Sequence, residues 1–117
     1  MIERRKCQRM RTRFPAVVLD RDSGEMVGHL VNITTHGIML QSELPLDVNT
    51  DYHFRMELPD EILGRTELEF HAQSLWCNRS PNPAYYRTGL QLVRLSGDDE
   101  ATIELLIKDY VFEHLIS

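Results

Sequence analysis

The sequence predicts an all-β domain with one helix at its C-terminal end. Apolar and polar residues alternate over about six short segments between residues 14 and 94, as strands covered on one face require, and no helical pattern lies between these segments. Their hairpin-like spacing favours an antiparallel barrel or sandwich over a parallel sheet. At 117 residues and 42% hydrophobic, the chain is long enough for one compact domain with its own core and too short for two typical ones.

Turn-forming residues separate the predicted strands. Residues 20–24 supply acidic and small side chains for a first hairpin turn. The alternation breaks again at residues 32–37, where we expect Gly37 to adopt a backbone conformation that a side chain would forbid. A loop with two prolines, at residues 78–84, precedes the last strand. The predicted strands span about residues 14–19, 26–33, 38–40, 52–58, 68–76 and 86–94.

Two of these strands show the alternation most clearly, and their apolar positions predict the core. In both strands, charged or polar residues lie between apolar residues two positions apart. For the single tryptophan, Trp76, core packing is the default expectation. The inward positions are Tyr52, Phe54, Met56, Leu58, Leu68, Phe70, Ala72, Ser74 and Trp76, with Leu90 and Leu92 on one face of the last strand.

The C-terminal segment has the pattern of a helix. Ser96 is a suitable N-cap, and the acidic residues that follow it suit the positive end of a helix. The spacing of apolar residues predicts a helix that extends to about Leu115. Leu105, Phe112 and Ile116 form a second, narrower stripe, which either packs between barrel and loops or contacts another subunit or partner. The main apolar stripe consists of Ile103, Leu106, Ile107, Tyr110 and Val111.

Charge is distributed unevenly along the chain. Of 13 basic and 18 acidic residues, residues 1–13 hold six bases and one acid, a charge of +5, so the other 104 residues carry −10. Because an acidic body would repel a long polyanion, this asymmetry indicates a small anionic partner held by a basic arm. We therefore expect an arm at residues 1–13, a barrel at 14–95 and a helix at 96–117. The bases of the arm are Arg4, Arg5, Lys6, Arg9, Arg11 and Arg13.

No pattern typical of an enzyme or a metal centre is present in the sequence. There is no nucleophile motif, paired acid and base or Cys-x-x-Cys spacing, so we expect a binding module without catalytic residues, metal or resident cofactor. His53 and His71 could meet as metal ligands, although two surface histidines on a sheet are more often solvated. Cys7 and Cys77 fit reduced thiols. No apolar run approaches the ~20 residues that cross a bilayer, so we expect a cytoplasmic protein without a membrane span.

Two short motifs contain groups suited to a guanine nucleotide. Arg5 and Arg9 lie four residues apart, and a guanidinium donates two parallel hydrogen bonds to a phosphate or to the O6/N7 edge of guanine. Asn32, Thr34 and Gly37 add an amide, a hydroxyl and a position where a ligand can approach the backbone. Either motif alone is weak, because arginine runs are usually solvated and such a stretch is usually a turn that hydrogen-bonds its own backbone.

Taken together, the two motifs resemble the paired signature of the PilZ domain family, which are bacterial receptors for cyclic di-GMP. The family pattern is RxxxR before the first strand and (D/N)xSxxG some twenty residues later. Here the matching segments are residues 4–9, RRKCQR, and residues 32–37, NITTHG. The resemblance extends along essentially the whole chain. It implies a six-stranded, Greek-key-like antiparallel barrel with helical elements outside it.

By this resemblance, the arm would bind the nucleotide. Arg5 and Arg9 would contact its guanine and phosphate groups, with Arg4 assisting. Because the like charges of the free arm repel one another, the ligand would neutralise them and order the arm against the barrel. The adjacent Arg4 and Arg5 are compatible with a stacked pair of nucleotides as well as with a single one.

The resemblance also assigns the barrel residues of the site. Asn32 would hydrogen-bond a guanine edge, Thr34 a phosphate or base, and Gly37 would permit the tight turn. Thr34 replaces the usual serine of the family, and its additional methyl group predicts weaker binding. Trp76 and Gly89 fall where the closing strands of many members have such residues, and both would lie next to the ligand.

The leading hypothesis is a cyclic di-GMP-binding signalling adaptor that changes conformation and passes the signal to a protein partner. Two alternatives stay open. One is a PilZ-like protein-interaction module that no longer binds nucleotide. The other is a small barrel that binds single-stranded nucleic acid through its arm, which the acidic body opposes. The second stripe of the C-terminal helix is compatible with a homo-oligomer.

Overall fold

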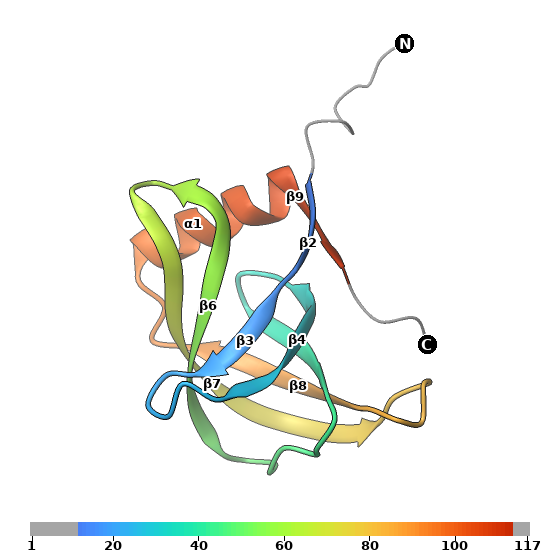
Figure 1. Ribbon diagram of the computed structural model, residues 1–117. Coiled ribbons are helices and arrows are strands. Elements are labelled where there is room, and N and C mark those ends of the chain that lie inside the picture. Colours follow the sequence, from blue (N-terminus) through green and yellow to red (C-terminus); the bar gives the residue numbers. More distant parts are fainter. Residues whose placement is uncertain (1–11, 114–117) are drawn as a thin grey trace.

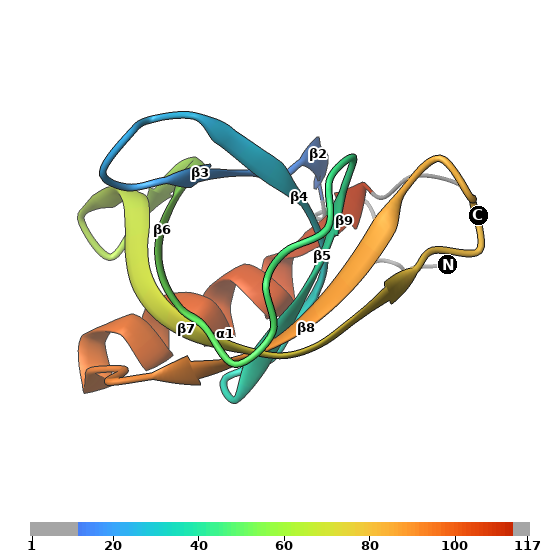
Figure 2. The ribbon, with the colours of Figure 1, turned by 90° about the horizontal axis from the view of Figure 1, so that it is seen from below.

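The structure, a computed structural model, describes the backbone of residues 12–113 and the side chains of residues 16–110. Six strands form a closed barrel in the order β3-β4-β5-β8-β7-β6, and every neighbouring pair is antiparallel (Figures 1 and 2). The predicted six-stranded antiparallel barrel is therefore confirmed. The barrel strands are β3 Val17–Asp20, β4 Met26–Ile33, β5 Gly37–Ser42, β6 Asp51–Ile62, β7 Arg65–Arg79 and β8 Tyr86–Val93.

The core fills the barrel with side chains that alternate along each strand. Burying such apolar side chains stabilises the fold by about 1.5–3 kcal/mol each. Phe54 and Phe70, which are partners across β6 and β7, meet edge to face with ring centroids 5.9 Å apart. The buried hydrophobic residues are Ala16, Val18, Leu30, Ile33, Ile38, Leu40, Phe54, Met56, Ile62, Leu68, Phe70, Ala72, Leu90, Leu92, Ile103 and Leu106.

A β-bulge in β7 overturns one of the expected core positions. The register between β7 and β8 shifts between Ser74 and Trp76, so Leu75 and Trp76 both lie on the outside, 49% and 41% exposed. The expectation that Trp76 packs in the core is therefore wrong, because the additional residue reverses the alternation beyond it. Ser74 is fully buried, and its hydroxyl bonds backbone groups of Asp47 and Thr50 in the loop between β5 and β6.

Helix α1, Gly97–Asp109, covers one end of the barrel (Figure 1). Its predicted N-cap is confirmed, since the Ser96 hydroxyl accepts a hydrogen bond from the backbone N–H of Asp99 at 3.1 Å. The Asp99 carboxylate also pairs with Arg65, at the start of β7, and so holds the helix to the β6–β7 hairpin. None of the helices in the described part of the chain is long and apolar enough to cross a membrane.

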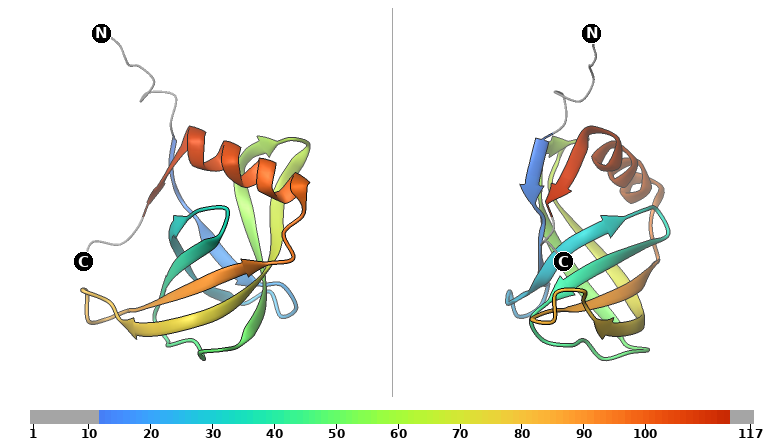
Figure 3. Two further views of the ribbon diagram at one scale, coloured as in Figure 1. Left: turned by 180° about the vertical axis from the view of Figure 1, so that it is seen from behind. Right: turned by 90° about the vertical axis from the view of Figure 1, so that its right-hand side faces the viewer.

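The expected helix to about Leu115 is too long. The chain leaves the helix at Tyr110 and forms strand β9, Tyr110–Glu113, which pairs in parallel with β2, Thr12–Pro15 (Figure 3). Aromatic and β-branched residues at the end of the expected helix favour a strand, and β2 satisfies their backbone groups. Phe112 thus belongs to β9 and Ile116 lies outside the described residues, so the second helical stripe does not form.

The first predicted strand, residues 14–19, is in fact two strands. β2 pairs with β9 outside the barrel, and β3 begins a residue after the buried Ala16, within the barrel. The strand that directly follows the basic arm is therefore joined to the segment that follows α1. Strand β9 also lies beside β4.

Candidate functional site

The segment 32–37 forms a turn that joins β4 to β5 and is closed by its own threonine. The Thr34 hydroxyl accepts hydrogen bonds from the backbone N–H groups of His36 and Gly37, both at 3.1 Å, and the Thr34 N–H donates to the Gly37 carbonyl at 2.9 Å. Both acceptor positions of the hydroxyl are thereby used. Its own hydrogen points to the Gly37 carbonyl at 3.4 Å, which is long for such a bond, and so it is available to an incoming acceptor.

Gly37 is required for a reason other than the expected one. Its φ angle is not positive, so the backbone conformation is open to other residues. A Cβ at this position would instead lie 2.7 Å from the backbone carbonyl oxygen of Leu90 in the neighbouring strand β8. The glycine permits a close approach of β5 and β8, and the expectation of a forbidden backbone conformation is wrong.

Five of the predicted site residues line one hollow on the outside of the barrel. Its volume is about 260 Å³, and the residues come from the end of β4, the following turn, β5, the bulge of β7 and β8. A second hollow of about 590 Å³ shares Thr34, Gly37, Leu75 and Leu90 with it, so the two form one groove. The predicted residues in the first hollow are Asn32, Thr34, Gly37, Trp76 and Gly89, and they are joined by Ile38, Met39, Leu75 and Leu90.

The Trp76 indole lies directly on Gly89, its partner across the two strands. A Cβ added to Gly89 would be only 2.3 Å from both Nε1 and Cε2 of the indole. One face of the indole ring therefore packs on Gly89, while the tryptophan remains 41% exposed. An aromatic surface fixed in this way can stack with a planar ring of a ligand.

Sequence reasoning missed Leu75 and Met39 as lining residues. Met39 lies between two buried residues of β5 and so points outward by simple alternation. Leu75 has no such signal. It reaches the groove only because the bulge in β7 turns it outward. In the sequence, the regular alternation that ends in Trp76 gives no sign of that bulge.

The described residues of the groove contribute no strong positive charge. Among the described residues that line the two hollows, none is a lysine or an arginine. The groove offers an amide from Asn32, the hydroxyl hydrogen of Thr34 and apolar surface, which suit a planar heterocycle better than an isolated anion. The predicted arginines Arg4, Arg5 and Arg9 lie outside the described residues.

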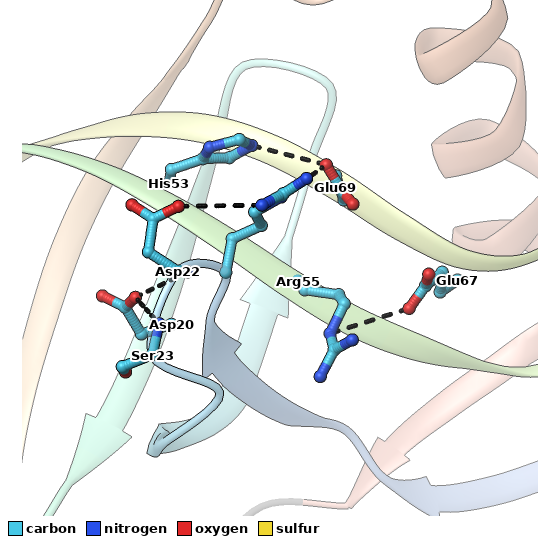
Figure 4. A network of polar contacts seen from close by, with 8 residues as sticks. Asp20, Asp22, Ser23, His53, Arg55, Glu67 and Glu69 are labelled. Carbon is cyan, nitrogen blue, oxygen red and sulfur yellow. Dashed lines mark hydrogen bonds and ion pairs between the residues drawn. The ribbon is translucent and has the colours of Figure 1, made fainter.

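The two histidines considered as metal ligands do face each other, on the outside of β6 and β7. His53 and His71 are cross-strand partners, and their rings stack with centroids 4.1 Å apart. The His53 Nε2 lies 3.6 Å from Glu69 Oε1, and the Arg21 Nε lies 3.3 Å from the same oxygen (Figure 4). The described residues contain no group of three or more potential metal ligands. On this surface the Glu69 carboxylate contacts both Arg21 and His53.

The same view shows the predicted hairpin turn after β3. The Asp20 carboxylate accepts hydrogen bonds at 2.9 Å from the backbone N–H groups of Ser23 and Asp22 (Figure 4). These bonds, that from Ser23 first, lower the pKa of Asp20 below its ordinary value. Gly24 completes the turn with a φ of 77°. The turn prediction for residues 20–24 is confirmed.

Comparison with known proteins identifies the fold. The model of the PilZ domain family matches residues 3–112. The Bacillus subtilis inhibitor of motility, MotI/DgrA, is similar at a TM-score of 0.64 and 20% identity, over 92% of this chain and 51% of that one. The PilZ domain of YcgR from Escherichia coli, solved with c-di-GMP, is similar at a TM-score of 0.60 and 10% identity, over 81% of each chain.

The chain thus spans about half the length of the Bacillus subtilis protein. No curated protein sequence matches it. At such low identity the two solved structures show a shared fold, and the family match covers nearly the whole chain. The resemblance noted in the two sequence motifs is therefore confirmed: this chain belongs to the PilZ domain family.

Proposed function

We propose that this protein is a cytoplasmic receptor for cyclic di-GMP that binds the nucleotide in the groove beside Trp76 and passes the signal to a protein partner. One observation supports the proposal above all others. Residues from the turn after β4 and from β7 and β8, far apart in the sequence, line a single groove that suits a planar heterocycle. A neighbour with the same fold, the YcgR PilZ domain, was solved with c-di-GMP.

Each group of the groove then has a chemical task. A guanine stacks on the exposed face of the Trp76 indole, and the Asn32 amide hydrogen-bonds an edge of the base. The hydrogen of the Thr34 hydroxyl, whose acceptor positions already close the turn, is donated to a phosphate oxygen or a base acceptor. The close contact of Gly37 with β8 keeps the turn near the Trp76 indole, which lies on Gly89 of the same strand.

The arm supplies the charge that the groove lacks. Cyclic di-GMP is a dianion, and the chain outside residues 1–13 has a charge of −10, so the ligand requires nearby cations. Arg9 precedes Thr12 of β2 by three residues, a reach of about 10 Å in an extended chain. In this proposal Arg4, Arg5 and Arg9 fold over the nucleotide, and the ordered arm forms the surface that the partner protein binds.

Calorimetric titration of the full chain with cyclic di-GMP, GTP and cyclic AMP tests the proposal and gives the number of nucleotides bound. We expect binding of cyclic di-GMP alone, with a change in the fluorescence of the single tryptophan. Arg5→Ala or Arg9→Ala should weaken binding by about 2–5 kcal/mol, roughly 30- to 5,000-fold. Lys108→Ala, which removes one charge from the exposed side of α1, is the matched control and should leave affinity unchanged.

Two results would contradict the proposal. A wild-type protein that binds no cyclic di-GMP would remove the receptor function and favour a module that acts through protein contacts. Equal affinity in wild type, Arg5→Ala and Arg9→Ala would remove the arm from the site.

A further inference from the structure

The second hollow of the groove is lined by a histidine, His36, from the turn that joins β4 to β5. This hollow, of about 590 Å³, shares Thr34 and Gly37 with the hollow beside Trp76. The His36 backbone is hydrogen-bonded on both sides. Its N–H donates to the Thr34 hydroxyl at 3.1 Å, and its carbonyl accepts from the Leu92 N–H at 2.8 Å. The turn and β8 therefore fix the place of this residue beside the groove.

The imidazole of His36 is exposed, and it has no hydrogen-bond or ion-pair partner in the described part of the chain. It is the one titratable side chain among the described residues that line the two hollows. A neutral imidazole has a single N–H donor, whereas a protonated one has two donors and a positive charge. Among these lining residues, His36 is thus the side chain that can become a cation.

The charges around His36 favour an anionic ligand. No carboxylate is found among the described residues that line either hollow, so no described side chain there would neutralise a protonated imidazole. An anion from outside is then its natural partner, since a hydrogen bond between two charged groups is stronger than one between neutral groups. The nearest charged or titratable residues along the strands of the groove line neither hollow; they are His29 on β4, His71 and Cys77 on β7, Arg87 on β8 and Arg94 directly after β8.

We propose that protonated His36 binds a phosphate of cyclic di-GMP, so that the receptor binds its nucleotide more tightly as the pH falls. The inference rests on the proposed function, since it assigns a phosphate contact in the same groove. Each guanosine of cyclic di-GMP is joined directly to a phosphate, so a guanine stacked on Trp76 brings a phosphate toward the adjoining hollow. Histidine changes its charge between about pH 5 and 8, whereas arginine stays charged. The arm thus supplies a constant charge, and His36 makes the affinity depend on pH.

Calorimetric titration of the full chain with cyclic di-GMP from about pH 8 to about pH 6 tests the inference, because neither the guanines nor the phosphates change charge in this range. We expect the wild-type affinity to rise about 5- to 10-fold, which lies between an exposed ion pair and a hydrogen bond to a charged group. His36→Gln should keep the weaker, high-pH affinity of the wild type throughout. His36→Arg is charged at every pH, so its affinity should not vary and should exceed that of the wild type at the higher pH. Titrations in buffers with different ionisation enthalpies should show a proton uptake by the wild type that is absent from both variants.

His53→Gln is the matched control. It removes an imidazole that lies on the outside of β6, 3.6 Å from the Glu69 carboxylate, and that lines neither hollow. We expect this variant to keep the affinity and the pH dependence of the wild type. A wild-type affinity that does not change with pH, or a His36→Gln variant that keeps the wild-type pH dependence, would overturn the role of His36 while the receptor function stands. A wild-type protein that binds no cyclic di-GMP at any pH would overturn both proposals.

Discussion

Replacing Thr34 by valine separates the two tasks of its hydroxyl, closing the turn and binding the ligand. Valine keeps the shape of the side chain but removes the acceptor of two backbone hydrogen bonds, from His36 and Gly37, each at 3.1 Å. A hydrogen bond contributes about 0.5–1.5 kcal/mol net, and water can replace part of this loss because the turn is exposed. We therefore expect Thr34→Val to lower the free energy of unfolding by about 1–2 kcal/mol.

Urea denaturation followed by circular dichroism measures this loss, and a lower midpoint with an unchanged slope would identify it as a change in stability. Calorimetry with cyclic di-GMP then measures the effect of the substitution on binding affinity. Thr34→Val should bind less tightly by roughly tenfold, since one ligand hydrogen bond is lost. Thr34→Ser keeps the hydroxyl and removes only the methyl group, so it should keep the stability and bind at least as tightly as wild type. Wild-type stability in Thr34→Val, or weaker binding in Thr34→Ser than in Thr34→Val, would refute the reasoning.

Three further predictions concern the support of the groove and the barrel. Gly37→Ala places a Cβ 2.7 Å from a backbone oxygen of β8 and should lower the unfolding free energy by about 1–3 kcal/mol in urea denaturation, whereas Gly97→Ala, with open space around it, should not. Ser74→Ala removes two hydrogen bonds between the buried Ser74 hydroxyl and part-buried backbone groups of Asp47 and Thr50, and should cost about 1–3 kcal/mol in the same assay. Asp20 has a lowered pKa, so its contribution to stability is complete above its ordinary value of 3.8 and is lost as the pH falls through the folded value. In thermal melts, the melting temperature of Asp20→Asn should therefore fall less than that of the wild type between neutral and acidic pH. Identical dependence of the two melting temperatures on pH would contradict this role of Asp20.

The parts of the fold that follow from local pattern were predictable. Alternation placed Phe54, Met56, Leu68 and Phe70 in the core, because a strand with one covered face must bury every second residue. Ser96 fixed the start of α1 for an equally local reason, since an N-cap acts on residues within one turn. The end of the helix was not predictable in this way. Residues Tyr110–Glu113 form β9 because a partner strand, β2, lies nearby.

In the candidate site, too, the features set by local sequence were predictable and those set by a neighbouring strand were not. The turn at residues 32–37 was recognisable, and the structure places Asn32, Thr34 and Gly37 together in one groove. The reason for Gly37 was misjudged, since its constraint is a carbonyl from a strand more than fifty residues away along the chain. The position of Trp76 was also misjudged, because a single inserted residue in β7 moved it from the core to the surface.

The sequence by itself determined the strand pattern, the start of the helix, the opposite charges of arm and body and the order of the two motifs. Each of these depends on residues close together in the chain. Only the tertiary structure decided the register of β7 against β8 and the packing of the Trp76 indole on Gly89. Register is a property of two strands at once, fixed by their joint packing and hydrogen bonds, so neither strand specifies it alone.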